Sequence, residues 1–370
     1  MKILFVGGTG TLSNCTLTEA LNENNEVSVL NRGNRMDLIP SGVVFYKGDF
    51  YDCDSWAAQL KDKYFDVVID FLSRKPSDIR RVFPFFKNRC KQYIFISTAC
   101  VYRRNIEDLP IKETSPKPNT LWSYNTEKYE SEKELIRLSR ESAGCHWTIA
   151  RPYITYDNAR IPFAFTPPYK HHRTILERIR AGKPMFVWNE GRTMTTLTYV
   201  HDFAQGLKGL FMNEEAMDTD FHITGDFTCT WKEFWQTLYS KLKLEPNVIN
   251  VSPEDINKYL PNYAEMFAGD RSLDAVFDNT KIKETIPTLR FRYNLEQGIN
   301  KVLEYYENAS HHNYDYAYDA QVDRMLARYS QNTHYVKYPN AKKKSYFIYF
   351  IYRHFNYRIA QILCRKIRMK

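Results

Sequence analysis

The chain has 370 residues, of which 43% are hydrophobic and 26% are charged, and its net charge is +9. This composition is typical of a soluble globular protein and excludes a mostly disordered chain, a collagen or a small disulfide-rich scaffold. The longest compact apolar run, residues 346–352, is far shorter than the ~18 residues that would span a bilayer.

The seven cysteines are scattered and form no CxxC pair. We therefore expect reduced thiols, no zinc site and no disulfide framework. The first residues, MKILFVGG, pass from a short apolar run directly into a glycine turn. This pattern is typical of a buried strand rather than of a signal peptide, so we expect a cytoplasmic protein.

The first 150 residues alternate between short β-branched or aromatic runs and helical patterns. The predicted strands are 2–6, 26–30, 43–47, 67–71, 93–97 and 147–150, and the predicted helices are 13–22, 55–61, 77–89 and 125–142. This alternation implies parallel strands joined by crossover helices. The predicted fold is therefore α/β, a Rossmann-like doubly wound parallel sheet.

From about residue 161 the pattern loosens, and prolines mark a break in the chain. The elements expected after this break are a helix at 174–180, a strand at 196–200, a helix at 201–210, a strand at 221–224 and a helix at 231–242. The segment 308–319 is polar and aromatic, and we interpret it as a linker or an ordered arm.

A glycine-rich turn, GGTGTLS at residues 7–13, follows the first strand and opens the first helix. Glycines let the backbone approach a pyrophosphate, and the helix N-terminus supplies amides and a positive dipole end. The turn predicts a dinucleotide site formed by Gly7, Thr9, Gly10, Thr11 and Leu12. Ser13 stands where a third glycine is usual, and it is small enough for close packing.

The second strand runs into a segment that has no carboxylate, with Asn31, Arg32 and Arg35. An acidic residue here favours NAD, whereas a basic one accommodates the 2′-phosphate of NADP. We therefore favour NADP(H) as cofactor, with NAD(H) as the alternative. The alternative for Arg32 and Arg35 is that they contact no phosphate and are solvated charges of the loop.

Tyr124 and Lys128 are four residues apart and share one face of the predicted helix. A nearby ammonium lowers the pKa of a phenol, which makes it a usable proton donor and acceptor near neutral pH. The same spacing recurs at Tyr129 and Lys133, so the pair is weak evidence by itself. We interpret the second pair as a surface feature.

Further motifs follow in chain order: Gly48-Asp49-Phe50, STACVY at 97–102, Glu132 after Lys128, RPYITY at 151–156, YVHDFA at 199–204 and DNTK at 278–281. With these motifs, residues 1–305 resemble the extended short-chain dehydrogenase/reductase family, the NAD(P)-dependent sugar-nucleotide epimerases and dehydratases.

The resemblance implies that Tyr124 is the general acid/base, that Lys128 holds the nicotinamide ribose, and that Thr98 bonds the reacting hydroxyl or carbonyl of the substrate. It also implies further cofactor contacts at Asp49, Phe50, Phe71, Pro152, Tyr153 and Ile154. The implied domains are an NAD(P)-binding domain at 1–165 with 196–224 returning to it, a substrate-binding region at 166–195 and 225–307, and a linker and tail at 308–370.

Two departures narrow the implied reaction. Ala99 and Cys100 stand where the 4,6-dehydratases of the family carry Asp-Glu, which argues against water elimination. Thr195 stands where many UDP-sugar epimerases carry a phosphate-binding arginine, and Arg192 is a candidate substitute. The segment 191–224 is similar to an atypical bacterial branch of epimerase/reductase proteins. It is more distantly similar to chloroplast RNA-binding members that have lost the chemistry.

The positive charge is concentrated in the tail. After Asp323 there are twelve basic residues and no acidic one, which leaves 40 basic against 43 acidic residues in 1–323. If 346–363 is one helix, it has an apolar stripe of Ile348, Ile351, Phe355, Ile359 and Ile362, flanked by Arg353, Arg358 and Arg365. Three interpretations remain open: contact of 342–370 with an anionic membrane surface, packing on this chain or a partner subunit, and RNA binding.

Two functions follow from these patterns. The first is a sugar-nucleotide epimerase or 4-ketoreductase of glycan or polysaccharide biosynthesis, for which a homodimer and a peripheral position at the inner face of the membrane are open options. On this hypothesis we expect no metal and no nucleic-acid partner. The second is a catalytically inactive RNA-binding or scaffold protein on the same fold, because fold does not fix function.

Overall fold

The computed structural model describes residues 1–141, 144–308 and 313–368 and divides into two compact units. Unit 1 comprises Met1–Tyr156, Thr196–Thr228 and Ala275–Tyr293; unit 2 comprises Asp157–Thr195, Cys229–Asp274 and Asn294–Lys370. The predicted first domain extended to residue 165 and left 275–293 to the second region. These two boundaries differ from the units of the structure.

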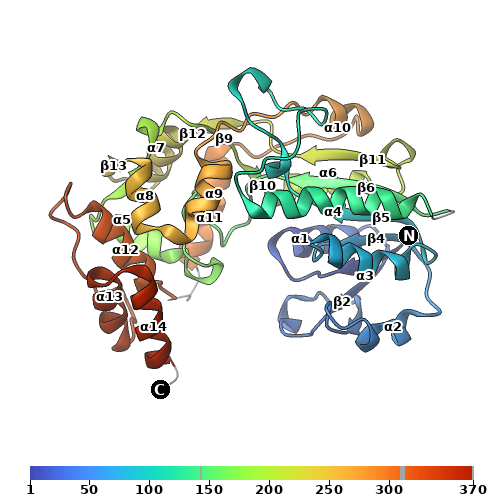
Figure 1. Ribbon diagram of the computed structural model, residues 1–370, viewed down its shortest axis with the longest axis horizontal. Helices are drawn as coiled ribbons and strands as arrows, with labels where there is room; N and C mark the ends of the chain where they lie inside the picture. The colour runs from blue at the N-terminus through green and yellow to red at the C-terminus, as the bar shows by residue number, and fades with distance from the viewer. Residues whose placement is uncertain (142–143, 309–312, 369–370) are drawn as a thin grey trace. The chain divides into compact units, whose positions relative to one another are not determined.

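The core of unit 1 is a seven-stranded parallel sheet (Figure 1). In sheet order its strands are β11 (Thr219–Ile223), β6 (His146–Pro152), β5 (Cys90–Ile96), β4 (Phe65–Asp70), β1 (Lys2–Val6), β2 (Glu26–Asn31) and β3 (Val44–Lys47). The order 3-2-1-4-5-6 is that of the Rossmann fold, with β11 added at one edge. The predicted fold class is confirmed.

Helices cover both faces of this sheet because side chains along a strand alternate between its faces. In β1, Ile3 and Phe5 join one buried cluster, whereas Leu4 and Val6 join the other. The first cluster packs against α1 (Thr11–Leu21) and α6 (Val200–Gly209), and the second against α2 (Asp54–Leu60), α3 (Pro76–Phe86) and α4 (Ser123–Ser139).

Each element predicted in the first 150 residues is present within a few residues of its expected ends; Ser142 lies outside the described residues. The strand expected at 196–200 is instead two short strands, β9 (Met194–Thr196) and β10 (Thr198–Tyr199). Val200 already belongs to α6, so the pairing of β10 with β7 (Thr155–Tyr156) is only two residues long. The short helix α10 (Thr280–Thr285) also lies in unit 1.

Unit 2 is mostly helical and has an aromatic core. Phe163 lies 4.6 Å from Trp235 between ring centroids, and Phe165 lies 5.3 Å from Trp188. Its elements are α5 (Arg173–Arg180), β8 (Met185–Val187), α7 (Trp231–Lys241), β13 (Val248–Asn250), α8 (Pro253–Tyr259), α9 (Ala264–Met266), α11 (Leu295–Asn308), α12 (Tyr316–Leu326), α13 (Lys344–His354) and α14 (Tyr357–Arg368), and β12 (Thr228–Thr230) begins at the boundary of unit 1.

Of the two alternatives for 308–319, a linker or an ordered arm, helix α12 corrects the linker. The segment 309–312 lies outside the described residues, but from Tyr316 the chain is a buried helix. Asp319 and Asp323 of α12 are fully buried and accept bonds from Arg178 Nη1 at 2.5 and 2.9 Å. Lys183 Nζ lies 2.8 and 2.6 Å from the same two carboxylates. Burial of charges requires such partners, and these partners are more than 130 residues away in sequence.

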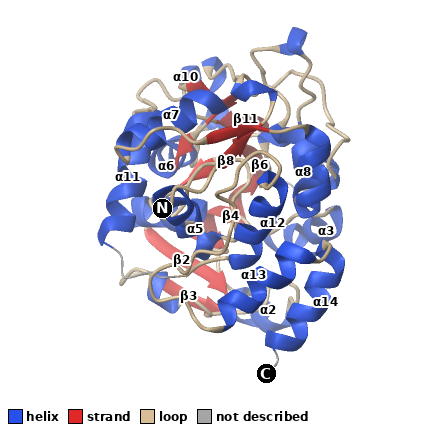
Figure 2. Cartoon of the chain, turned by 90° about the vertical axis from the view of Figure 1, so that its left-hand side faces the viewer, coloured by secondary structure: helices blue, strands red, loops and turns tan. Residues whose placement is uncertain are grey.

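The tail forms two helices instead of the single helix expected at 346–363. The chain leaves the helical conformation at Phe355, where φ is −104° and ψ is 157°, and α14 begins at Tyr357. Figure 2 shows α12, α13 and α14 side by side. The described part of the tail therefore packs on unit 2, which was one of the three interpretations. Among the described residues, no helix has the length and apolarity that crossing a membrane requires.

Candidate active site

The glycine turn lies at the carboxyl end of β1, where the strand order of the sheet reverses between β1 and β4. Ligands of doubly wound folds bind at this point. Gly7 and Gly8 have φ values of +120° and +102°, which disfavour any other residue. A Cβ on Gly8 would also lie 2.2 Å from Val29 Cγ2. Glycine is therefore required at Gly8 both for its conformation and for the space available.

Ser13, at the position of the usual third glycine, bonds the turn. Its Oγ accepts a hydrogen bond of 3.0 Å from the backbone N–H of Gly10, the residue at the N-terminus of α1. The side chain is buried. The serine therefore stabilises the turn by this hydrogen bond, and its side chain is small enough to be buried where a glycine is usual.

The residues after β2 have separate roles. Asn31 Nδ2 donates to the carbonyl of Gly7 at 3.1 Å, and Arg35 Nη1 donates to the carbonyl of Thr9 at 2.9 Å. Both side chains therefore fix the glycine turn from outside, and Arg35 is not merely a solvated charge. Arg32 is exposed, which leaves it as the basic side chain that can reach solvent at the end of β2.

Lys128 is buried on α4 and donates to two neutral backbone acceptors. Its Nζ donates to the carbonyls of Ser73 and Ile96, both at 2.7 Å. Burial is the main influence on the lysine; it outweighs the attraction of Asp70 and lowers the pKa of Lys128 to about 8. The ammonium therefore titrates close to neutral pH.

The end of β5 is tied to α4 at two points. Lys128 bonds Ile96, and Ser97 Oγ donates to Glu132 Oε1 at 2.5 Å. Thr98 follows directly; it is 6% exposed, and its Oγ1 accepts from the N–H of Cys100 at 3.2 Å. The structure thus brings the segment that carries Thr98 to the helix that carries Tyr124 and Lys128.

Tyr124 lies in the first turn of α4, and its ring faces a cation. The Arg74 guanidinium is 5.3 Å from the ring centroid, and Trp122 packs 4.9 Å away. Arg74 is held by Glu127 at 2.6 Å. By contrast, Lys133 of the second pair is exposed and bonds Glu130 at 2.9 Å, which fits our interpretation of that pair as a surface feature.

Several other expected cofactor residues have side chains engaged in packing. Phe50 is buried against Arg81, Phe71 stacks on Phe5 at 6.0 Å, and Tyr153 Oη accepts from Arg104 at 3.1 Å. Pro152 lies on β6 beside β11, Ile154 has a positive φ of 28°, and Asp49 Oδ1 accepts from the N–H of Tyr51. Their cofactor roles, which would involve backbone or ring edges, stay predictions.

Arg192, the expected substrate-phosphate ligand, belongs to unit 2. It is exposed and lies 3.5 Å from Glu190. The remaining predicted residues, Tyr124, Lys128, Thr98 and the glycine turn, all belong to unit 1. The role of Arg192 therefore stays a prediction.

The sequence reasoning named Phe71 directly after β4 but missed its polar neighbours Asp70 and Ser73. Asp70, fully buried at the strand end, accepts from the N–H groups of Leu72 and Ser73, both at 2.9 Å. Ser73 Oγ is buried and has no hydrogen-bond partner in the described part of the chain. An acidic residue at the carboxyl end of an apolar strand, such as Asp70, was the available signal, because ligands bind at that edge.

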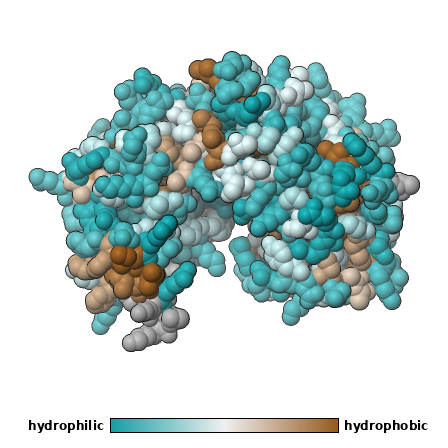
Figure 3. Space-filling model, in the orientation of Figure 1, coloured by the Kyte–Doolittle hydropathy of each residue, from teal (hydrophilic) through white to brown (hydrophobic). Residues whose placement is uncertain are grey.

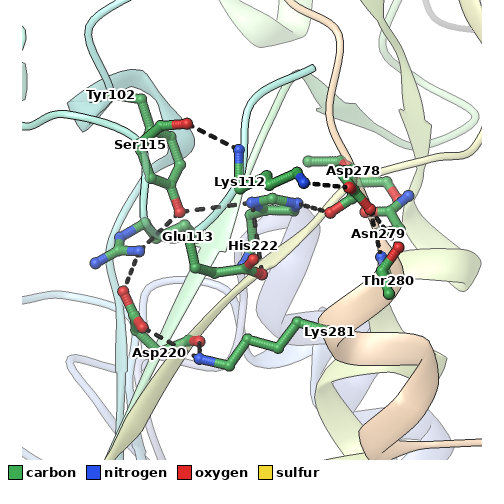
Figure 4. A network of polar contacts seen from close by, with 12 residues as sticks. Tyr102, Lys112, Glu113, Ser115, Asp220, His222, Asp278, Asn279, Thr280 and Lys281 are labelled. Carbon is green, nitrogen blue, oxygen red and sulfur yellow. Dashed lines mark hydrogen bonds and ion pairs between the residues drawn. The ribbon is translucent and has the colours of Figure 1, made fainter. Parts of the chain in front are cut away.

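Figure 4 shows part of a buried polar network that includes Tyr102, Asp220 and His222. The Arg151 guanidinium donates two hydrogen bonds to Glu132, at 2.7 and 2.8 Å. Its Nη1 also lies 2.5 Å from Asp220 and donates to Tyr102 Oη at 2.7 Å. Such bidentate pairing is strong and directional. Burial lowers the pKa of nearby His222 to about 4, so this ring is neutral at pH 7. Through Glu132, the network fixes α4 relative to β5 and β6.

The residues at this edge fit a dinucleotide. The turn at residues 7–10 has no room for a Cβ at Gly8, and the N-terminus of α1 follows the turn. The buried Ser73 hydroxyl, which has no partner among the described residues, lies next to the buried ammonium of Lys128. Among the described residues, no group of three or more His, Cys, Asp or Glu side chains is placed to hold a metal ion.

Comparisons with known proteins give the family and the fold. The model of the NAD dependent epimerase/dehydratase family matches residues 3–223. A chloroplast stem-loop binding protein of 41 kDa from Arabidopsis thaliana is 26% identical over 271 residues, 69% of this chain and 67% of that protein. A UDP-glucose 4-epimerase from Lactobacillus helveticus is 27% identical over 171 residues, 41% of this chain and about half (51%) of its own length.

Among solved structures, the UDP-glucuronic acid 4-epimerase from Bacillus cereus, in complex with UDP-glucuronic acid and NAD, has a similar fold. The TM-score is 0.66 at 18% identity, over 83% of this chain and 99% of that one.

Proposed function

Because the chain belongs to the NAD dependent epimerase/dehydratase family, as its motifs predicted, and is an NAD(P)-dependent enzyme of the extended short-chain dehydrogenase type, we propose that it epimerises or reduces a sugar nucleotide at one hydroxyl-bearing carbon. The observation that carries this proposal is the arrangement of Tyr124, Lys128 and Thr98 at one edge of the sheet. Sugar-nucleotide chemistry of this kind supplies glycan biosynthesis, and we place the reaction there and in the cytoplasm.

Bound NAD(P) supplies the acceptor and donor of the hydride. When the substrate carbon loses its hydride, Tyr124 accepts the proton of the attached hydroxyl; when the hydride returns, Tyr124 gives the proton back. Thr98 Oγ1 donates a hydrogen bond to the same substrate oxygen. The Lys128 ammonium stabilises the phenolate form of Tyr124 by charge, and Arg74 beside the ring adds to this effect.

The residues after Thr98 argue against elimination of water. Ala99 and Cys100 are buried in a short 3-10 helix, and neither supplies a carboxyl group. An elimination requires both an acid and a base beside the leaving hydroxyl. We therefore propose 4-epimerisation or 4-ketoreduction of a UDP-sugar, with Arg192 on the nucleotide phosphates.

We favour NADP(H) over NAD(H) as the cofactor. No carboxylate ends β2, and exposed Arg32 lies where a 2′-phosphate would be read. Arg35 contributes less to this preference, because its guanidinium already bonds Thr9.

The test is to incubate the protein with UDP-glucose or UDP-glucuronic acid and NAD(P), and to separate the 4-epimers by chromatography. We expect conversion that requires Tyr124 and is unchanged by Tyr129→Phe. If neither sugar is converted but a 4-keto sugar nucleotide is reduced with NADPH, the protein is the ketoreductase. If none of these substrates reacts and no NAD(P) binds, the proposal is wrong.

The second candidate function is RNA binding without catalysis. It is favoured by the similarity to the chloroplast stem-loop binding protein and by the basic tail. A binding protein has no need for a buried lysine that titrates near neutral pH beside Tyr124. RNA binding with no NAD(P) binding would favour this candidate. A homodimer paired through the region of α4 is a further proposal, which light scattering would test.

A further inference from the structure

The outer surface of the two tail helices exposes large apolar side chains. We call this surface the tail face; it consists of Tyr346, Phe347, Phe350, Phe355, Ile359 and Ile362. Each of these side chains is 40–60% exposed. Figure 3 shows the corresponding hydrophobic patch over α13 and α14. Clustered exposed aromatic and aliphatic groups of this kind mark interaction sites.

The opposite side of the same helices is fixed to unit 2. Tyr349 Oη of α13 donates to buried Asp323 of α12 at 2.6 Å, and in the segment before α13 Tyr338 Oη donates to Asp319 at 2.9 Å. Tyr352 and Cys364 are buried in the same cluster as Tyr349. Rotation of α13 to hide the tail face would break the bond between Tyr349 and Asp323. The apolar side chains therefore stay exposed in the folded chain.

Basic side chains border the tail face. Phe347, Phe350 and His354 of α13 recur at helical spacing with Lys343, the N-cap of that helix, so the four lie on one side. On α14 the same holds for Arg358, Ile362 and Arg365, and these two arginines are exposed. No acidic residue occurs after Asp323. The tail face thus combines an apolar centre with a cationic border.

We propose that the tail face docks on an anionic lipid surface. An apolar helix face buried at the headgroup boundary, with Lys and Arg beside anionic headgroups, is the usual geometry of an interfacial amphipathic helix. The helices lie on the surface and do not span the bilayer. Unit 2 is thereby held at the membrane, and the site in unit 1 needs no change.

Charge disfavours a second copy of this chain, and the aliphatic part of the tail face disfavours single-stranded RNA. A second copy of this chain, packed through the same surface in a two-fold dimer, would bring two cationic tails together, which costs free energy. Single-stranded RNA binds by stacking bases on aromatic rings. Ile359 and Ile362 supply no ring, yet they occupy the centre of the α14 portion.

The test is co-sedimentation of the full chain with vesicles of phosphatidylcholine that contain phosphatidylglycerol, and with vesicles of phosphatidylcholine alone. Deletion of 324–370 is not used, because it would remove Tyr338 and Tyr349 from the buried carboxylates. The apolar variant is F347S/F350S, with Y64S/I106S as its control. Tyr64 and Ile106 are exposed apolar residues of unit 1.

The charge variant is R358E/R365E, and its control is K61E/K63E, which makes the same charge change in unit 1. We expect binding to the anionic vesicles only, weakened by about tenfold or more in both tail variants and within about twofold of the parent in both controls. Raised salt should weaken binding further. Thermal unfolding of each variant checks that it folds.

Three results would overturn the proposal. One is no binding to anionic vesicles. Another is binding that the tail variants leave unchanged. The third is a dimer or a complex with single-stranded RNA that the apolar variant abolishes while vesicle binding persists, because another partner would then cover the tail face.

Discussion

Lys128 in unit 1 and Lys183 in unit 2 are both buried lysines, but their partners differ. Lys128 bonds two backbone carbonyls and its pKa falls to about 8. Lys183 lies between two carboxylates, Asp319 and Asp323, and Arg178 completes a cluster of two cations and two anions. Burial lowers the pKa of Lys183 as well, so the partners and not the pKa distinguish the two lysines.

The difference distinguishes a lysine whose ammonium is available to a ligand, Lys128, from one whose ammonium stabilises the fold, Lys183. A buried ammonium with neutral partners keeps a charge that is only partly compensated, and perturbed groups of this kind gather at functional sites. A buried ammonium between two carboxylates is compensated, and its removal leaves unpaired charge. The following predictions test this contrast, from the largest expected effect to the smallest.

Lys183→Met should destabilise the protein by about 3–5 kcal/mol, because it leaves two buried carboxylates with one cation, Arg178, between them. Chemical denaturation measures the change. The control is Lys241→Met, which removes an exposed pair with Glu296 and should cost no more than about 1 kcal/mol. Equal losses of unfolding free energy in both variants would show that the buried cluster stabilises the protein no more than an exposed ion pair does.

Tyr124→Phe should lower kcat by about 10³-fold and leave unfolding unchanged, because it removes the proton-transfer group but keeps the ring. Steady-state kinetics with a sugar nucleotide measures the loss. Tyr129→Phe is the matched control within the second Tyr/Lys pair and should retain full activity. A similar loss in both variants would contradict the assignment.

Lys128→Met should lower kcat by about 10²-fold while stability changes by no more than about 1 kcal/mol. The side chain loses two hydrogen bonds but also the cost of a buried charge, so the two effects on folding offset each other. Kinetics and denaturation on the same sample compare it with Lys183→Met. A large loss of stability would place Lys128 among the structural lysines.

Arg32→Ala should weaken NADPH binding by about tenfold and leave NADH binding unchanged, because it removes the cation near the 2′-phosphate. Fluorescence titration with each nucleotide measures both affinities. Equal changes for NADPH and NADH would remove the basis for an NADP preference.

The pH dependence of kcat and of stability should report the ionisation of Lys128. Its pKa is lowered, so the cation is present below about pH 8 and is lost as pH rises through that value. The value of kcat should therefore decline above about pH 8. Stability should rise over the same range, because the unfolded lysine binds its proton up to about pH 10.4. A profile that stays flat to pH 10 would contradict the low pKa.

The sequence predicted the features that depend on neighbouring residues. The glycine turn, the alternation of strands with helices and the spacing of Tyr124 and Lys128 are each fixed by a short segment and its period. It could not predict the carboxylates of α12, because Arg178 and Lys183, which pair with them, lie far away in the chain. It also missed Ser73, whose role arises only when Lys128 of α4 reaches across to its carbonyl.

The most direct test of the central claim is the mass of any nucleotide that co-purifies with the protein, followed by titration with NADPH and NADH. The account predicts NAD(P) binding through the glycine turn, with tight retention if the hydride is returned within one turnover and weaker, reversible NADPH binding if the protein is a reductase. Failure of both nucleotides to bind at millimolar concentration would contradict the account.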